Sequence, residues 1–183
     1  MLKLTGKTQC VSDRPIKDKT RETRNNPGDS HQLAFSTFHS KPYLKNDEIC
    51  KFLAKRINEA DELHNFAVLA YVFMPDHVHL LIHPMDEIYD MSKILQAIKQ
   101  GPSRTATNRK WISSALWEEG GGHDSNFSNA KERTHCITYI HFNPLRKDLV
   151  ADPWDYRWSS ANWYINEIEC EVECHRMSEF FES

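Results

Sequence analysis

Apolar side chains are concentrated in two stretches that predict β-strands. The stronger one covers residues 66–83 (FAVLAYVFMPDHVHLLIH), where Pro75 and Asp76 separate two apolar arms. This pattern predicts a β-hairpin with a tight turn. A weaker stretch, from His31 to Phe38, predicts a strand that precedes it.

Three further segments repeat apolar side chains at the spacing of an amphipathic helix. They cover residues 46–63, 90–99 and 128–143, and the first and third begin at residues that favour helix N-caps. Gly101-Pro102 is expected to break or re-aim the second helix, and Pro144 ends the third. The pattern predicts no element between residues 103 and 127.

The order strand, helix, strand, strand, helix, helix predicts an α+β fold. It is the order of a ferredoxin-like sandwich, in which an antiparallel sheet has helices packed on one face. The expected organisation is a flexible N-terminal arm at residues 1–30, one folded domain at 31–166 and an acidic C-terminal tail at 167–183.

Composition indicates a single soluble domain. The chain has 183 residues, of which 39% are hydrophobic and 27% are charged. Its longest apolar run, residues 66–74, is shorter than a membrane-spanning helix, and the opening residues lack the pattern of a secretory signal. We therefore expect a cytoplasmic protein without membrane contact. The five cysteines are scattered and odd in number, so free thiols are expected.

The net charge of −3 is unevenly distributed along the chain. Residues 167–183 contain six acidic side chains and one basic one, so the rest of the chain carries a small positive charge. A local basic groove is therefore compatible with the overall negative charge, although composition alone does not demonstrate one.

Two histidines on the hairpin are candidate metal ligands. Because side chains alternate along a strand, His77 and His79 share one face while Val78 points to the other. This pairing favours metal ligation over a structural role, although a third ligand is needed. His83 continues the same face, as a ligand or as an exposed side chain. The remaining candidates near the C-terminus are expected at the surface: Cys170, Cys174 and His175.

A second pair of polar side chains lies on the third predicted helix. Tyr139 and Asn143 are four residues apart, so they share one face of that helix and lie one turn from each other. By itself this pair is weak evidence for a site, because a helical tyrosine usually packs in the core with its hydroxyl at the rim.

Two segments resemble motifs of a known family. Residues 71–82 (YVFMPDHVHLLI) resemble the His-hydrophobic-His strand of the HUH single-strand endonucleases. Residues 139–150 (YIHFNPLRKDLV) resemble the nucleophile segment of the REP-associated tyrosine transposases. The resemblance spans roughly residues 31–164. Shorter stretches are similar to that family in the same order: Leu116-Trp117, residues 120–124 (GGGHD) and residues 158–161 (WSSA).

The resemblance implies a metal-dependent enzyme that cleaves and rejoins single-stranded DNA. Tyr139 is then the catalytic nucleophile, and His77, His79 and Asn143 hold Mg²⁺ or Mn²⁺. Such a donor set leaves coordination positions open for phosphate and water, with zinc as an inhibitory competitor. The family's usual substrate is a palindromic hairpin cleaved through a covalent phosphotyrosine, by a monomer or homodimer.

Basic and aromatic side chains around these motifs are candidates for DNA contacts. Some of Trp111, Trp117 and Trp158 are expected to stack on bases. The expected phosphate contacts are Lys93, Lys99, Arg104, Arg109, Lys110, Arg146 and Lys147.

The sequence departs from the family in ways that leave other functions open. The family commonly has Asn where Asp76 stands and Gly where Asp148 stands. A carboxylate at position 76 either tightens cation binding or repels phosphate. The main alternative is thus a hairpin DNA-binding protein that has lost cleavage activity. A cupin-like or hydrolytic metalloenzyme fits poorly, because the six glycines do not supply its glycine-rich hairpins.

Overall fold

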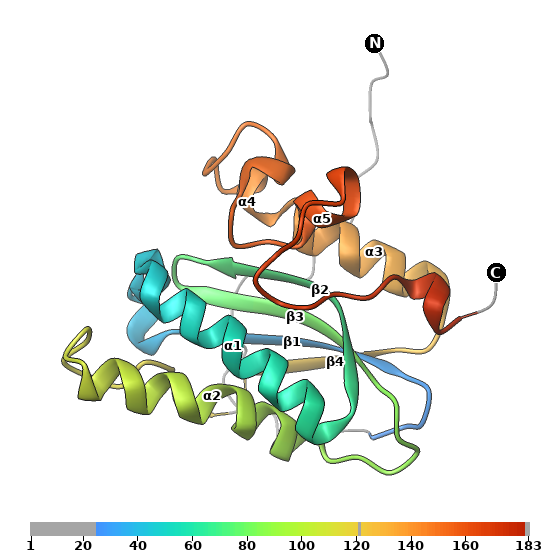
Figure 1. The fold of residues 1–183 in the computed structure, drawn as a ribbon, viewed down its shortest axis with the longest axis horizontal. Helices are drawn as coiled ribbons and strands as arrows, with labels where there is room; N and C mark the ends of the chain where they lie inside the picture. The colour runs from blue at the N-terminus through green and yellow to red at the C-terminus, as the bar shows by residue number, and fades with distance from the viewer. Residues whose placement is uncertain (1–24, 121, 182–183) are drawn as a thin grey trace.

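A four-stranded antiparallel sheet forms the centre of the protein (Figure 1). The structure is a computed structural model that describes residues 25–120 and 122–181, so most of the expected N-terminal arm lies outside the described residues. The strand order β2-β3-β1-β4 with the helix crossovers confirms the predicted α+β ferredoxin-like sandwich. The elements are β1 (Ser30–Ser36), η1 (Phe38–Ser40), η2 (Tyr43–Lys45), α1 (Asp47–His64), β2 (Phe66–Met74), β3 (His77–Pro84), α2 (Met91–Asn108), β4 (His123–Phe127), α3 (Ala130–His141), α4 (Asn143–Arg146), η3 (Pro153–Asp155), α5 (Ala161–Asn166) and η4 (Met177–Glu179).

Helices cover both faces of the sheet. The helices α1 and α2 lie side by side on one face, as expected, and bury side chains such as Val78 and Leu80. The opposite face carries α3, so the expectation that all helices pack on one face is wrong. The reason is that β2 presents large apolar side chains to both sides of the sheet. A bulge between Val68 and Ala70 shifts the alternation within β2, which is buried along its whole length. The helix that carries Tyr139 therefore packs on the same face of the sheet as His77 and His79.

The fourth strand was not predicted from the sequence. β4 has polar side chains and no apolar alternation, and it is held mainly by backbone pairing with β1. Gly122 precedes it with φ +80°, and an added Cβ there would collide with the carbonyl oxygen of Ala34. A hydrogen bond of 3.0 Å between His31 Nδ1 and Asp124 Oδ1 adds a side-chain link between the two strands.

The expected break at Pro102 is wrong, because α2 continues through it to Asn108. A proline removes one helical hydrogen bond and crowds the preceding turn. In the turn of α2 that precedes Pro102, two side chains from outside the helix donate to backbone carbonyls. Arg56 Nε donates to Ala97 O (3.0 Å), and Trp117 Nε1 donates to Lys99 O (3.0 Å). The other two predicted helices are confirmed as α1 and α3, and asparagine side chains cap both of them. No helix among the described residues is long and apolar enough to span a membrane.

The edge strand β2 is covered by the C-terminal part of the chain. Phe73 N donates to Trp158 O (2.8 Å), and His175 N donates to Val68 O (2.8 Å). Between these contacts, Val172 is fully buried against the core. The described part of the acidic segment thus packs on the domain and shields a strand edge.

The turn between β2 and β3 is clamped by the chain that follows β1. Thr37 is fully buried, and its backbone N–H donates to Asp76 O (2.8 Å). Its hydroxyl donates to the carbonyls of Lys41 (2.6 Å) and Asp76 (2.9 Å), while Leu44 N donates to Pro75 O (3.0 Å). These bonds fix the backbone at the start of β3, where the two candidate histidines lie.

We expect Thr37→Val to lower the free energy of unfolding by about 1–2 kcal/mol, because the Lys41 and Asp76 carbonyls lose a buried donor while the side-chain shape is kept. Urea unfolding followed by circular dichroism measures this change. Thr107→Val, at an exposed helical threonine, is the matched control and should change stability by less than about 0.5 kcal/mol. Equal losses in the two variants would contradict the role of the clamp.

The last turn of α3 is joined to the C-terminal segment by a buried histidine. His141 Nε2 lies 2.9 Å from Ser160 Oγ, and this hydroxyl oxygen also accepts from Tyr71 N (3.0 Å). Burial lowers the pKa of His141 from 6.5 to about 4, because it disfavours the charged imidazolium. Folding therefore favours the neutral form of this side chain.

We expect the stability of the wild-type protein to decrease as the pH falls from about 6.5 to about 4, because the unfolded chain takes up a proton that folded His141 excludes. The contribution of this group is about 3 kcal/mol at most. His141→Gln keeps a hydrogen-bonding side chain but does not titrate, so its unfolding free energy should depend less on pH.

Urea unfolding at neutral and acidic pH compares the two proteins. His135→Gln, at an exposed position of the same helix, controls for the loss of a histidine. An identical pH dependence in wild type and His141→Gln would rule out this assignment.

Candidate active site

His77 and His79 lie side by side at the start of β3. Their ring centroids are 4.9 Å apart and the rings are nearly perpendicular, at 85°. The predicted pairing on one face of the strand is thus confirmed. That face is covered by α3 rather than open to water, so the His79 residue is only 8% exposed. His77 keeps more contact with solvent at the strand end, and Asp76 Oδ1 lies 2.6 Å from its Nδ1.

Tyr139 reaches this pair from α3 of the same chain. Its ring centroid is 5.4 Å from that of His79, with the rings at 81°. The neighbouring Ile137 and Ile140 bury their side chains against β2 and β3, and this packing sets the position of the tyrosine. Arg146, from α4, places its guanidinium carbon 5.1 Å from the centre of the Tyr139 ring. The phenol, an imidazole and a cation therefore meet within one chain.

Asn143 is buried one helical turn after Tyr139. It is the first residue of α4, and Phe142 (φ −84°, ψ 0°) joins the two helices. The residue is 4% exposed, and its Nδ2 has no hydrogen-bond partner among the described residues. A buried amide in this state is a candidate to bind a group that the structure does not contain.

The donors available for a metal ion are two imidazoles and one amide. No group of three or more His, Cys, Asp or Glu side chains in residues 25–120 and 122–181 is placed to hold an ion. The two histidine rings are close enough to share one ion. Asn143 would ligate an ion through its carbonyl oxygen, Oδ1, while its unpaired Nδ2 can donate a hydrogen bond to a bound group. Such an incomplete shell suits a cation that also binds phosphate oxygens and water.

The other predicted ligand candidates lie elsewhere. His83 is buried near the far end of β3, where its Nδ1 is 3.2 Å from Ser30 Oγ and its ring contacts Phe181. Burial lowers its pKa. Cys170 and Cys174, expected at the surface, are half-buried against the core. None of these side chains is brought to the candidate active site.

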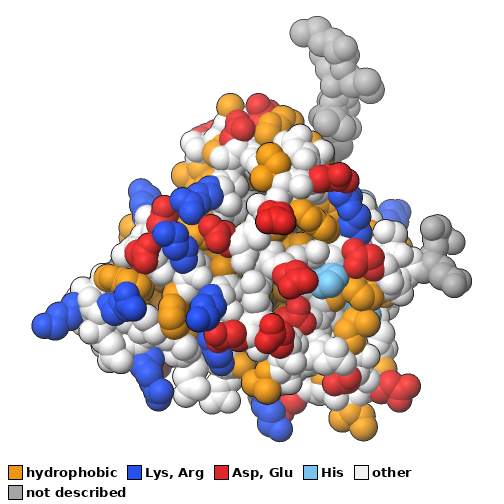
Figure 2. Space-filling view, in the orientation of Figure 1, with side chains coloured by type: hydrophobic (Ala, Val, Ile, Leu, Met, Phe, Trp, Pro, Cys, Tyr) orange, Lys and Arg blue, Asp and Glu red, His pale blue; other side chains and the backbone are white. Residues whose placement is uncertain are grey.

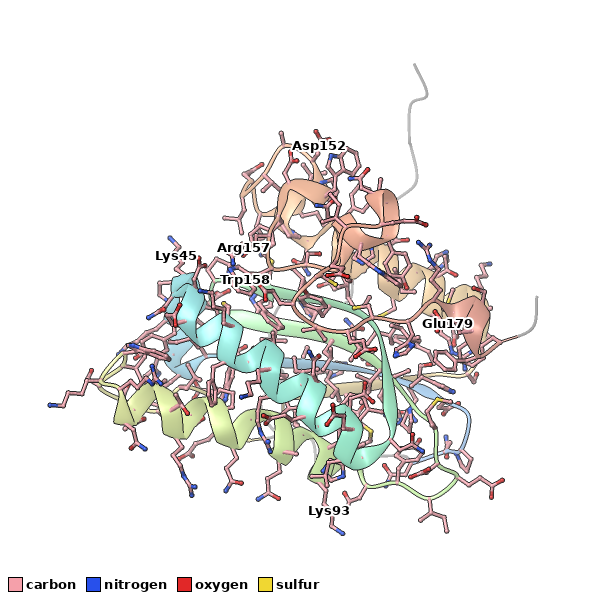
Figure 3. All side chains as sticks on the ribbon, in the orientation of Figure 1. Lys45, Lys93, Asp152, Arg157, Trp158 and Glu179 are labelled. Carbon is pink, nitrogen blue, oxygen red and sulfur yellow. The ribbon has the colours of Figure 1, made fainter. Side chains whose placement is uncertain are left out.

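The basic side chains predicted to contact DNA are distributed along the molecule. Lys93 lies near the start of α2, where its Nζ is 3.7 Å from Asp90, and Lys99 donates from the middle of α2 to Gly120 O (3.1 Å). Figure 3 shows Lys93 far from Lys45, an exposed lysine that marks the end of the sheet with the β2–β3 turn. Arg146 lies beside Tyr139. The other four predicted side chains are exposed: Arg104, Arg109 and Lys110 near the end of α2, and Lys147 directly after α4.

Basic side chains are unevenly distributed on the surface. In Figure 2, Lys and Arg side chains are most frequent at the left, over the end of the sheet that carries the β2–β3 turn. Acidic side chains gather towards the centre and right of the same view. Lys45 belongs to the basic end but was not predicted, because a single exposed lysine has no sequence signal.

Two of the three tryptophans expected to stack on bases are core residues. Trp117 packs edge-on against Phe35, and its Nε1 donates to Lys99 O. Trp158 donates to Asp47 Oδ1 (2.9 Å) and is 6% exposed. Trp111 alone is partly exposed, with the Arg109 guanidinium carbon 5.3 Å from its ring centre.

The departure from the family at Asp148 has a structural explanation. Its φ is +53°, in the left-handed region where glycine is favoured and aspartate is tolerated. This residue therefore satisfies the same backbone requirement as glycine, at some cost in strain.

Comparisons with known proteins identify two similar structures and one matching family model. A structure of a REP-associated tyrosine transposase bound to a REP hairpin is similar over 90% of this chain and 95% of that chain, with a TM-score of 0.70 and 16% identity. A protein from Deinococcus radiodurans R1, described as a transposase, is similar over 66% of this chain and 95% of its own, with a TM-score of 0.46 and 18% identity. No curated protein matches the chain. Residues 30–141 match the family model described as "Transposase IS200 like", which covers more than half of the chain, so this protein belongs to the IS200-like transposase family.

Proposed function

We propose that the protein cleaves and rejoins single-stranded DNA through a covalent bond to Tyr139, with hairpin DNA as its substrate. The observation that carries this proposal is the contact of the Tyr139 ring with His79, at 5.4 Å, in the same chain. A relative with the same fold was solved with a REP hairpin, which supports this substrate class.

The proposed reaction is a transesterification at phosphorus. The Tyr139 oxygen loses its proton and forms a bond to phosphorus while the bond to the 3′ oxygen breaks, and the 3′ oxygen takes up a proton and leaves as a hydroxyl, so no net proton is consumed. The phosphotyrosine retains the bond energy of the phosphodiester, so attack by a 3′-hydroxyl rejoins strands without ATP. A phenol is a weak nucleophile near neutral pH, so charge at the phosphate must be neutralised.

Residues of the chain supply this neutralisation and the alignment. His77, His79 and Asn143 would hold Mg²⁺ or Mn²⁺ in the proposed site, and such an ion would supply positive charge that polarises the phosphate. Arg146 provides a fixed positive charge beside the attacking phenol. Packing of α3 holds the Tyr139 ring beside His79, and a fixed position of this kind favours attack on a bound phosphate.

The proposed DNA surface lies at the basic end of the sheet. It leaves out Lys93, which lies near the start of α2 beside Asp90, and Lys99, whose ammonium group already donates to Gly120 O. It comprises Arg104, Arg109, Lys110, Arg146 and Lys147, with Trp111 as a stacking surface.

We expect Tyr139→Phe to abolish the covalent protein–DNA adduct while leaving hairpin affinity within about twofold of wild type, because only the attacking oxygen is lost. Denaturing gels of a labelled hairpin oligonucleotide with a single-stranded flank, incubated in Mn²⁺, detect the adduct. Tyr89→Phe, which removes a phenol hydroxyl at the other end of the sheet, is the control and should retain the adduct.

Two outcomes would contradict the proposal in different ways. Adduct formation by Tyr139→Phe would exclude this tyrosine as the nucleophile. Hairpin binding by the wild-type protein without any adduct, across a series of pH values in Mn²⁺, would favour the alternative of a binding protein without cleavage activity.

We expect Arg146→Ala to slow adduct formation on the order of 10²-fold, because a positive charge beside the reacting phosphate is lost. Single-turnover rates on the same hairpin measure the effect. Lys93→Ala removes one positive charge far from Tyr139 and should change the rate by less than about twofold. Similar losses in both variants would indicate a general electrostatic effect instead of a local one.

A further inference from the structure

Asp76 contacts His77 from a position that the backbone fixes firmly. Its carbonyl accepts hydrogen bonds from both the backbone and the hydroxyl of Thr37. Its side chain points to the adjacent imidazole, where Oδ1 lies 2.6 Å from Nδ1. The side chains of Asp76 and His77 are 42% and 22% exposed, so the contact forms at the solvent-accessible rim of the candidate active site.

This contact determines which ring nitrogen is protonated. An ionised carboxylate only accepts hydrogen bonds, so His77 Nδ1 carries the hydrogen and donates it to Asp76. In the neutral ring, the lone pair then lies on Nε2, on the other side of the imidazole. A carboxylate behind a histidine commonly orients a metal ligand and raises its basicity.

We propose that Asp76 is a positioning residue that holds His77 with Nε2 directed at a divalent cation. The inference rests on the proposed function, since the cation is the one held by His77, His79 and Asn143. A carboxylate at position 76 could either tighten cation binding or repel phosphate, and the inference favours tighter cation binding. Asp76 bonds the Nδ1 side of the His77 ring, so its negative charge makes Nε2 a stronger metal ligand. The imidazole ring lies between the Asp76 carboxylate and a phosphate on the Nε2 side.

The tautomer of His77 can be tested in the metal-free protein. Long-range ¹⁵N–¹H correlation spectra of protein with ¹⁵N-labelled histidine distinguish protonation at Nδ1 from protonation at Nε2. We expect the Nδ1–H form of His77 in wild type and a shift towards Nε2–H in Asp76→Ala. An Nε2–H form in the wild-type protein would overturn the inference, whatever the catalytic activity.

Mn²⁺ titration by calorimetry at a fixed neutral pH tests the effect on the cation. We expect Asp76→Ala to weaken Mn²⁺ binding about 10- to 100-fold. Asp76→Asn should cause a smaller loss, because its amide oxygen still accepts from Nδ1 but lacks the charge. Asp148→Asn, at an exposed carboxylate whose left-handed backbone also suits asparagine, is the charge-matched control and should bind as wild type does.

The outcomes separate this inference from the proposed function. Equal Mn²⁺ affinity in wild type and Asp76→Ala would overturn the role of Asp76 and leave the metal site intact. Wild type that binds no more Mn²⁺ than His77→Ala would overturn the metal site itself, and the inference with it. Thr37 bonds the Asp76 backbone and not its side chain, so both Asp76 variants should fold, which circular dichroism checks.

Discussion

The packing of α3 against the outer face of the β2–β3 hairpin is the contact on which the candidate active site depends. Ile137 and Ile140 lie in one apolar cluster with Leu81, so burial of hydrocarbon surface sets the position of the helix. Tyr139 lies between these two isoleucines in sequence and meets His79 at the edge of the same cluster. The polar site is therefore assembled by apolar packing, and any change that moves α3 also moves the tyrosine.

A second constraint acts on the strand that carries the histidines. Thr37 and Leu44 hold the carbonyls of the β2–β3 turn, so the first residues of β3 have a fixed backbone. Side chains on a rigid strand end keep their geometry better than those on a loop. The Asp76 carboxylate is available to bond His77 because the clamp uses only its backbone.

The negative net charge of the chain is compatible with DNA as a partner because basic side chains are concentrated at one end of the surface. Acidic side chains of the C-terminal segment pair with nearby basic side chains, as Glu171 does with Arg157 and Glu179 with His175. Several basic side chains lie instead at the end of the sheet with the β2–β3 turn. Asp148 adopts a left-handed backbone conformation, which glycine favours and aspartate tolerates.

The sequence alone determined the hairpin, the capped helices α1 and α3, and the pairing of His77 with His79, because alternation and capping act over a few neighbouring residues. It did not determine β4, which forms a strand because its backbone pairs with β1. Nor did it determine that α2 continues past Pro102, where Arg56 and Trp117 donate hydrogen bonds to helix carbonyls. It predicted Tyr139 and Asn143 on one helix, whereas the structure places them on α3 and α4, which meet at Phe142. Only the tertiary structure decided that Tyr139 meets His79 of its own chain, because packing between segments far apart in sequence leaves no local pattern.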